Sequence, residues 1–132
     1  MIRIAALLLP LLMIAASCAP GPDMAMAGGT ERVCFMSDRI INFRAGQSPS
    51  VYVRALGGDV FELQSTGYCR DLDSAISLGF SPLTGSSDRT CVGDSIDIDV
   101  SVAGASSNRC RARVVRQLSE EEVAALPSRY RP

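Results

Sequence analysis

Two stretches in the C-terminal half of the chain alternate strictly between apolar and polar residues. In residues 95–103, SIDIDVSVA, isoleucine and valine alternate with serine and aspartate. In residues 109–114, RCRARV, cysteine, alanine and valine alternate with arginine. A period of two is typical of a β-strand with one buried face. We therefore expect a hairpin around a loop at residues 103–107, with one apolar and one charged face.

The register of this hairpin is predicted by pairing opposite charges. The expected pairs are Asp97 with Arg113, Asp99 with Arg111, Ile98 with Ala112, and Val100 with Cys110. Another hairpin is predicted over residues 51–65, VYVRALGGDVFELQS, turning at Gly57 and Gly58. A two-residue loop there would place apolar side chains opposite polar ones on the same face. A three-residue loop at 57–59 avoids this and sets Val53 against Leu63, Ala55 against Phe61, and Arg54 against Glu62.

A short helical turn is predicted between the two hairpins. Asp71 is its expected N-cap and Gly79 its end. Leu72, Ala75 and Ile76 are then expected to face inward.

The end of the chain has the pattern of a short capped helix. Ser119 is the expected N-cap and Glu122 its capping-box partner. Leu118 is expected to pack against Val123, and Pro127 follows the end of the helix.

Four of the five cysteines fall within the predicted β region: Cys34, Cys69, Cys91 and Cys110. In an oxidising compartment, four cysteines predict two disulfides, with three possible connectivities. A Cys91–Cys110 bond is disfavoured, because Cys91 precedes the position opposite Cys110 by nine residues, roughly 30 Å of extended strand. We expect Cys69–Cys91 with Cys34–Cys110; the alternative, Cys34–Cys91 with Cys69–Cys110, remains open.

Together these patterns predict one mainly β domain at residues 33–132. Its expected architecture is a small antiparallel sheet, barrel or sandwich-like, stapled by two disulfides, with a short C-terminal helix.

Residues 1–17, MIRIAALLLPLLMIAAS, are typical of a signal peptide: one arginine, an apolar run too short to span a membrane, and then small residues. Residues 15–18, AASC, resemble the lipobox of bacterial lipoproteins, although that family prefers leucine where Ala15 stands. The resemblance implies that Cys18 is lipidated and that the protein is anchored in the outer membrane facing the periplasm. Residues 19–32 are rich in proline and glycine and have no periodic apolar pattern, so residues 18–32 are expected to comprise the lipidated cysteine and a flexible tether. The alternative is secretion as a soluble, inhibitor-like protein after cleavage at residues 25–27, AMA.

The composition of the chain argues against several classes of function. The chain has no histidine, so it lacks the usual general base and metal ligand. Its formal charge is −1, which provides no electrostatic footprint for nucleic acid. No cofactor motif, glycine-rich phosphate loop or zinc spacing occurs. An acidic set, Asp71, Asp73 and Asp94, is a candidate for a calcium site or a hydrolytic module.

The spread of several residue groups resembles a family of small proteobacterial envelope proteins known only as a domain of unknown function. The groups are Cys34, residues 40–43 (IINF), Tyr68 and Cys69 with Asp71 and Leu72, Gly79 and Phe80, Cys91 with Gly93, Asp94 and Ile96, Cys110, and Leu118 and Ser119 with Glu121 and Glu122. The resemblance implies a shared architecture and supplies no activity. The sequence therefore predicts a non-enzymatic envelope lipoprotein, a binding or structural module with an envelope protein or glycan as partner.

Overall fold

The computed structural model describes residues 32–83, 87–104 and 107–132. The predicted leader, Cys18 and nearly all of the predicted tether lie outside these residues. Within the described part of the chain, no helix has the length and hydrophobicity needed to cross a membrane.

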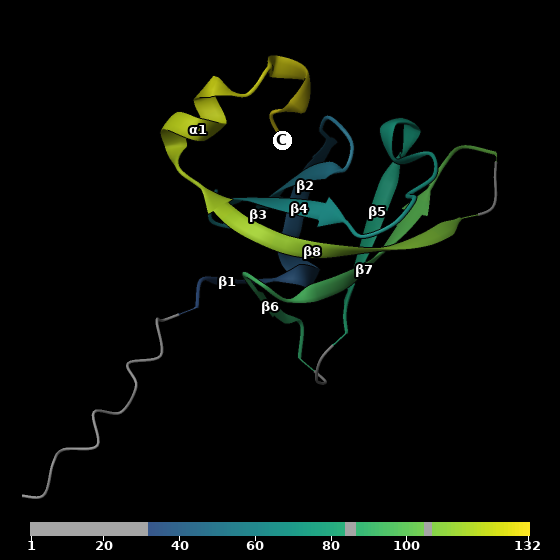
Figure 1. Ribbon diagram of the computed structural model, residues 1–132, viewed down its shortest axis with the longest axis horizontal. Coiled ribbons are helices and arrows are strands. Elements are labelled where there is room, and N and C mark those ends of the chain that lie inside the picture. Colours follow the sequence, from purple (N-terminus) through teal and green to yellow (C-terminus); the bar gives the residue numbers. More distant parts are fainter. Residues whose placement is uncertain (1–31, 84–86, 105–106) are drawn as a thin grey trace, which may run out of the picture.

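Six strands form an antiparallel, nearly closed, barrel-like sheet in the order β2-β3-β4-β8-β7-β5 (Figure 1). Their bounds are β2 Ile40–Ala45, β3 Ser50–Ala55, β4 Val60–Ser65, β5 Ser77–Pro82, β7 Ser95–Ser101 and β8 Asn108–Leu118. A separate two-stranded sheet joins β1, Cys34–Met36, to β6, Arg89–Cys91. The helical elements are short: η1 Ser37–Arg39, η2 Leu72–Ser74, α1 Glu120–Ala125 and η3 Ser128–Tyr130. The predicted fold class is confirmed.

The interior of the sheet is filled by alternate side chains of β3, β4, β7 and β8. These buried residues are Val51, Val53, Ala55, Phe61, Leu63, Ile96, Ile98, Val100, Cys110, Ala112 and Val114. The two-stranded sheet adds Phe35 to this core, with its ring centroid 4.4 Å from that of Phe61. The period-two pattern of the sequence thus predicts the buried face correctly. Removal of this apolar surface from water is the main effect that stabilises the fold.

The hairpin predicted over residues 51–65 forms between β3 and β4, but its register differs from the expected one by two residues. The strands pair Val51 with Leu63, Tyr52 with Glu62, Val53 with Phe61, and Arg54 with Val60. The expected pairs Val53–Leu63, Ala55–Phe61 and Arg54–Glu62 are therefore wrong. The Ala55 amide donates to the Asp59 carbonyl at 2.9 Å, so the loop is residues 56–58. A shift of two keeps every side chain on its face, so the apolar pattern cannot distinguish the two registers.

The hairpin of β7 and β8 differs from its expected register in the same way. Its pairs are Ile96 with Ala112, Asp97 with Arg111, Ile98 with Cys110, and Asp99 with Arg109. The expected pairs Asp97–Arg113, Asp99–Arg111, Ile98–Ala112 and Val100–Cys110 are wrong by two positions. The predicted ladder of opposite charges nevertheless exists. Arg111 donates to Asp97 at 3.0 Å and Arg109 to Asp99 at 2.7 Å.

The disulfides are Cys34–Cys91 and Cys69–Cys110, so the expected pairing of Cys69 with Cys91 and Cys34 with Cys110 is wrong. The reason lies in the sheet topology. Strand β1 pairs with β6 rather than with β8, and Cys34 lies directly opposite Cys91. Cys110 then faces the segment after β4, where Cys69 lies with a Cα separation of 5.3 Å.

The predicted helical turn between the hairpins is shorter than expected. Only residues 72–74 are helical, and Gly79 belongs to β5. Asp71 adopts a left-handed backbone conformation, with φ of 59°, and its side chain does not cap the turn. Leu72 and Ala75 pack against the core as predicted, whereas Ile76 is 67% exposed, against the prediction.

The C-terminal helix α1 confirms its predicted cap. The Glu122 amide donates to the Ser119 hydroxyl, and the Glu122 carboxylate accepts the Ser119 amide. The Arg131 guanidinium donates to three carbonyl oxygens at the end of α1, at 2.7 to 3.1 Å, which satisfies groups that a helix end leaves unpaired. Two Arg54 nitrogens donate to the Pro132 carbonyl, so the segment after α1 is fastened to β3.

Candidate functional site

A groove of about 560 Å³ opens where the β2–β3 loop meets the segment that follows β4. It is lined by Ala45, Gly46, Ser48, Pro49, Ser50, Ser65, Gly67, Tyr68, Cys69, Asp71, Leu72 and Asp73. We call this site the groove. Its volume lies within the range of about 300–1,000 Å³ that is usual for ligand sites.

The two walls of the groove are joined by the sheet and by a disulfide. The Ser65 amide donates to the Pro49 carbonyl at 2.9 Å, which links the β2–β3 loop to the end of β4. The Cys69–Cys110 disulfide fastens the other wall to β8. Gly46 is required by space, because a Cβ there would lie 2.7 Å from the ring of Tyr52. The walls are therefore held by the fold rather than by a ligand.

Three side chains give the groove its chemical character. Tyr68 is 86% exposed, more than any other large hydrophobic residue in the described part of the chain. Asp71 and Asp73 are exposed, and neither forms an ion pair with the described residues. No arginine is among the lining residues, and Arg70, their neighbour in sequence, does not line the groove. The groove thus combines an exposed aromatic ring with negative charge.

The three acidic candidates of the sequence do not converge on one site. Asp71 and Asp73 line the groove, whereas Asp94 accepts a hydrogen bond from the Cys91 amide and pairs with Arg32. These interactions, that of Arg32 first, hold the pKa of Asp94 below its ordinary value. Within the described residues, no group of three or more Cys, Asp or Glu side chains is placed to hold a metal ion.

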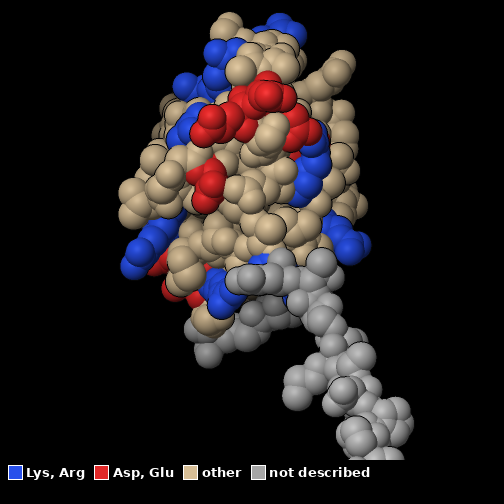
Figure 2. All heavy atoms as spheres, turned by 90° about the vertical axis from the view of Figure 1, so that its left-hand side faces the viewer, with Lys and Arg blue, Asp and Glu red and all other residues tan. Residues whose placement is uncertain are grey.

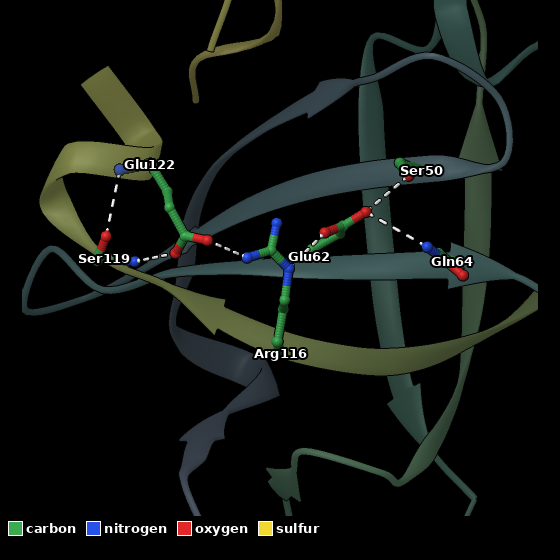
Figure 3. A network of polar contacts seen from close by, with 6 residues as sticks. All are labelled: Ser50, Glu62, Gln64, Arg116, Ser119 and Glu122. Atoms are coloured by element: carbon green, nitrogen blue, oxygen red, sulfur yellow. Dashed lines mark hydrogen bonds and ion pairs between the residues drawn. The ribbon is translucent and has the colours of Figure 1, made fainter. Parts of the chain in front are cut away.

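A second polar cluster lies on the outer face of β3, β4 and β8, and we call it the outer-face network (Figure 3). Its residues are Ser50, Glu62, Gln64, Arg116, Ser119 and Glu122. Glu62 is only 8% exposed, and its carboxylate accepts from the Ser50 hydroxyl at 2.9 Å and from Arg116 at 3.0 Å. Arg116 also pairs with Glu122, which joins the sheet to α1.

The charges of Arg116 and Glu122 in the outer-face network are stabilised by their neighbours. The Ser119 amide and Arg116 lower the pKa of Glu122, in that order, and the two glutamates raise the pKa of Arg116. Burial and the Glu62 charge raise the pKa of Tyr52, which lies opposite Glu62 on β3. On the face shown in Figure 2, acidic side chains gather in an arc with arginines near its ends. Glu62, Arg116 and Glu122 thus satisfy one another's charges, so the outer-face network has little left to offer a ligand.

Arg116 reaches the outer face because β8 contains a bulge. The pairing of β4 with β8 shifts between Glu62 and Leu63, so that Glu62 lies opposite Arg116 while Leu63 lies opposite Val114. One extra residue in β8 reverses its alternation. The alternation of the sequence breaks at the same place, because Val114 and Val115 are both apolar and the next arginine, Arg116, falls at an even position. This break was the available signal for the bulge.

Comparison with family models, with curated proteins and with solved structures finds no match to this chain. The interpretation of the groove therefore rests on its own geometry. The sequence pointed to Asp71 and Asp73, but for metal binding, and it assigned no role to Tyr68 or to the β2–β3 loop. The run of small and turn-forming residues at 46–50, GQSPS, was the available signal for a loop there.

Proposed function

We propose that this protein is a non-enzymatic binding module of the bacterial cell envelope, and that the groove is its binding site. The observation that carries the proposal is Tyr68, an aromatic side chain left 86% exposed on the rim of a preformed groove. An exposed aromatic ring of this kind is typical of recognition surfaces, because its burial against a partner yields large apolar contact at little conformational cost.

The envelope location is supported by the leader-like residues 1–17 and by the two disulfides, which suit an oxidising compartment. Anchoring through a lipid on Cys18 is part of the proposal. Intact mass measurement of the mature protein tests it: a diacylated or triacylated N-terminal Cys18 is the expected result, and an unmodified terminus at Gly28 would overturn the anchor.

The lack of histidine throughout the chain supports a binding role over a catalytic one. Turnover of an envelope substrate by the purified chain, lost on substitution of the groove residues, would contradict this part of the proposal.

The binding role is tested by screening the full chain against three probe classes by NMR: soluble glycan fragments, unstructured peptides and anionic lipid vesicles. Tyr68→Ala is compared with Leu56→Ala, which removes a 62% exposed side chain at the β3–β4 loop, outside the groove. We expect binding of at least one class to survive in Leu56→Ala and to be lost in Tyr68→Ala. Binding that is equal in the two variants, or absent for every class, would overturn the groove as the site.

A further inference from the structure

We propose that the groove binds an arginine or lysine side chain of an extended peptide partner. This inference rests on the proposed function and names its ligand. The cation is expected to contact the ring of Tyr68 and the carboxylates of Asp71 and Asp73. The partner is therefore a protein with an accessible basic segment.

The residues that line the groove indicate which sign of charge its ligand should carry. Asp71 and Asp73 are the only acidic or basic residues that line the groove. Asp94, Asp97 and Asp99 each form an ion pair with an arginine. The two groove carboxylates lack such a partner among the described residues, so a ligand that supplies a cation is complementary to the site.

The exposed ring of Tyr68 favours an organic cation over a metal ion. A guanidinium or ammonium group binds the face of an aromatic ring, and its attached methylene groups cover apolar surface. A divalent metal ion instead requires several converging oxygen ligands. Only two carboxylates line the groove, and no larger metal-ligating group occurs in the described residues.

The shape of the surroundings favours a peptide over a small free cation. Ala45, which lines the groove, is the last residue of β2, and β2 is an edge strand that pairs only with β3. Further along β2 this edge is not open to a peptide, because it faces β5 across a small gap that both strands line, and the Phe43 amide and carbonyl are already hydrogen-bonded to the side chains of Asn42 and Arg44. Open space surrounds Gly67, where an added Cβ would meet no atom within 4 Å. A peptide backbone can thus pass over Gly67 and direct a side chain into the groove.

The test uses the full chain and two capped tripeptides, acetyl-Gly-Arg-Gly-amide and its counterpart with citrulline in place of arginine. Citrulline keeps the shape of arginine and removes its charge. We expect the arginine peptide to bind about fivefold more tightly, or more, since it adds a cation–π contact and ion pairs with two exposed carboxylates. Added salt should reduce this preference, because the site is exposed.

The variant D71N/D73N is expected to abolish the preference for arginine. Its matched control, E120Q/E121Q, removes the same charge from exposed residues of α1 outside the groove and should retain the preference. Equal affinity for the two peptides, or a preference that persists in D71N/D73N, would overturn the inference. A neutral ligand that binds in a Tyr68-dependent manner would do so too, while leaving the proposed function in place.

Two further probes separate the sources of the cation. Spermidine that binds as tightly as the arginine peptide would overturn the peptide in favour of a free polyamine. Calcium that competes with the arginine peptide, and loses this effect in D71N/D73N, would overturn it in favour of a metal. Weak spermidine binding and no competition by calcium support the peptide.

Discussion

The outer-face network and the groove contain similar residues, but their carboxylates differ in whether a cation lies beside them. On the outer face, Arg116 lies between Glu62 and Glu122, and a hydroxyl and an amide complete the network. In the groove, Asp71 and Asp73 lie beside an exposed tyrosine with no cation among the lining residues. The difference indicates that charges on the outer face serve the fold, whereas charges in the groove are available to a ligand.

The largest expected effect concerns the disulfide that fastens one wall of the groove. Substitution C69A/C110A should lower the free energy of unfolding by about 2–4 kcal/mol, because the unfolded chain regains entropy. Hydrogen exchange should show lost protection in residues 66–75 while β3 and β4 stay protected. The matched variant C34A/C91A should instead loosen β1 and β6. Equal loosening of the groove in both variants would contradict the separation of the two regions.

The outer-face network should be more costly to break than an exposed ion pair. Arg116→Met leaves the buried carboxylate of Glu62 without its cation, and we expect it to lower the free energy of unfolding by about 1–2 kcal/mol. The control Arg109→Met removes a more exposed pair with Asp99 and should cost about 0–1 kcal/mol. Urea unfolding measures both. A larger cost for Arg109→Met would show that burial does not distinguish the two pairs.

Low pH should reduce the stability that the ion-paired carboxylates give to the fold. The pKa values of Asp94 and Glu122 are lowered in the folded protein, so their contribution to stability is present above the ordinary carboxyl pKa. It is lost as the pH falls below the ordinary carboxyl pKa and through the lowered folded-state pKa values. Melting temperature measured against pH should therefore fall at acid pH. The fall should be smaller in Glu122→Gln, and an identical acid profile for that variant would count against the role of this carboxylate.

The smallest effect on stability is expected in the groove. D71N/D73N should change the free energy of unfolding by less than about 0.5 kcal/mol, because neither side chain is buried or ion-paired within the described residues. Urea unfolding beside Arg116→Met gives the comparison directly. A loss as large as that of Arg116→Met would mean that the groove carboxylates serve the fold.

Much of the fold could be predicted from alternation and capping, as the buried faces of β3, β4, β7 and β8 and the cap at Ser119 demonstrate. The registers could not, because a shift of two residues conserves every face. The disulfide pairing could not either, since it depends on β1 leaving the main sheet to pair with β6.

The sequence predicted only part of the candidate site. Asp71 and Asp73 were visible as acidic residues, but Asp94, grouped with them, is engaged by Arg32 instead. The exposure of Tyr68 depends on how the segment after β4 is fastened through Cys69, which no local pattern reports.

The most direct test of the difference between the two regions is an NMR titration of the full chain with acetyl-Gly-Arg-Gly-amide, followed residue by residue. Chemical-shift changes should gather at residues 45–49 and 65–73 and leave Arg116 and Glu122 unchanged. Changes centred on the outer-face network, or spread evenly over the surface, would contradict the assignment of binding to the groove.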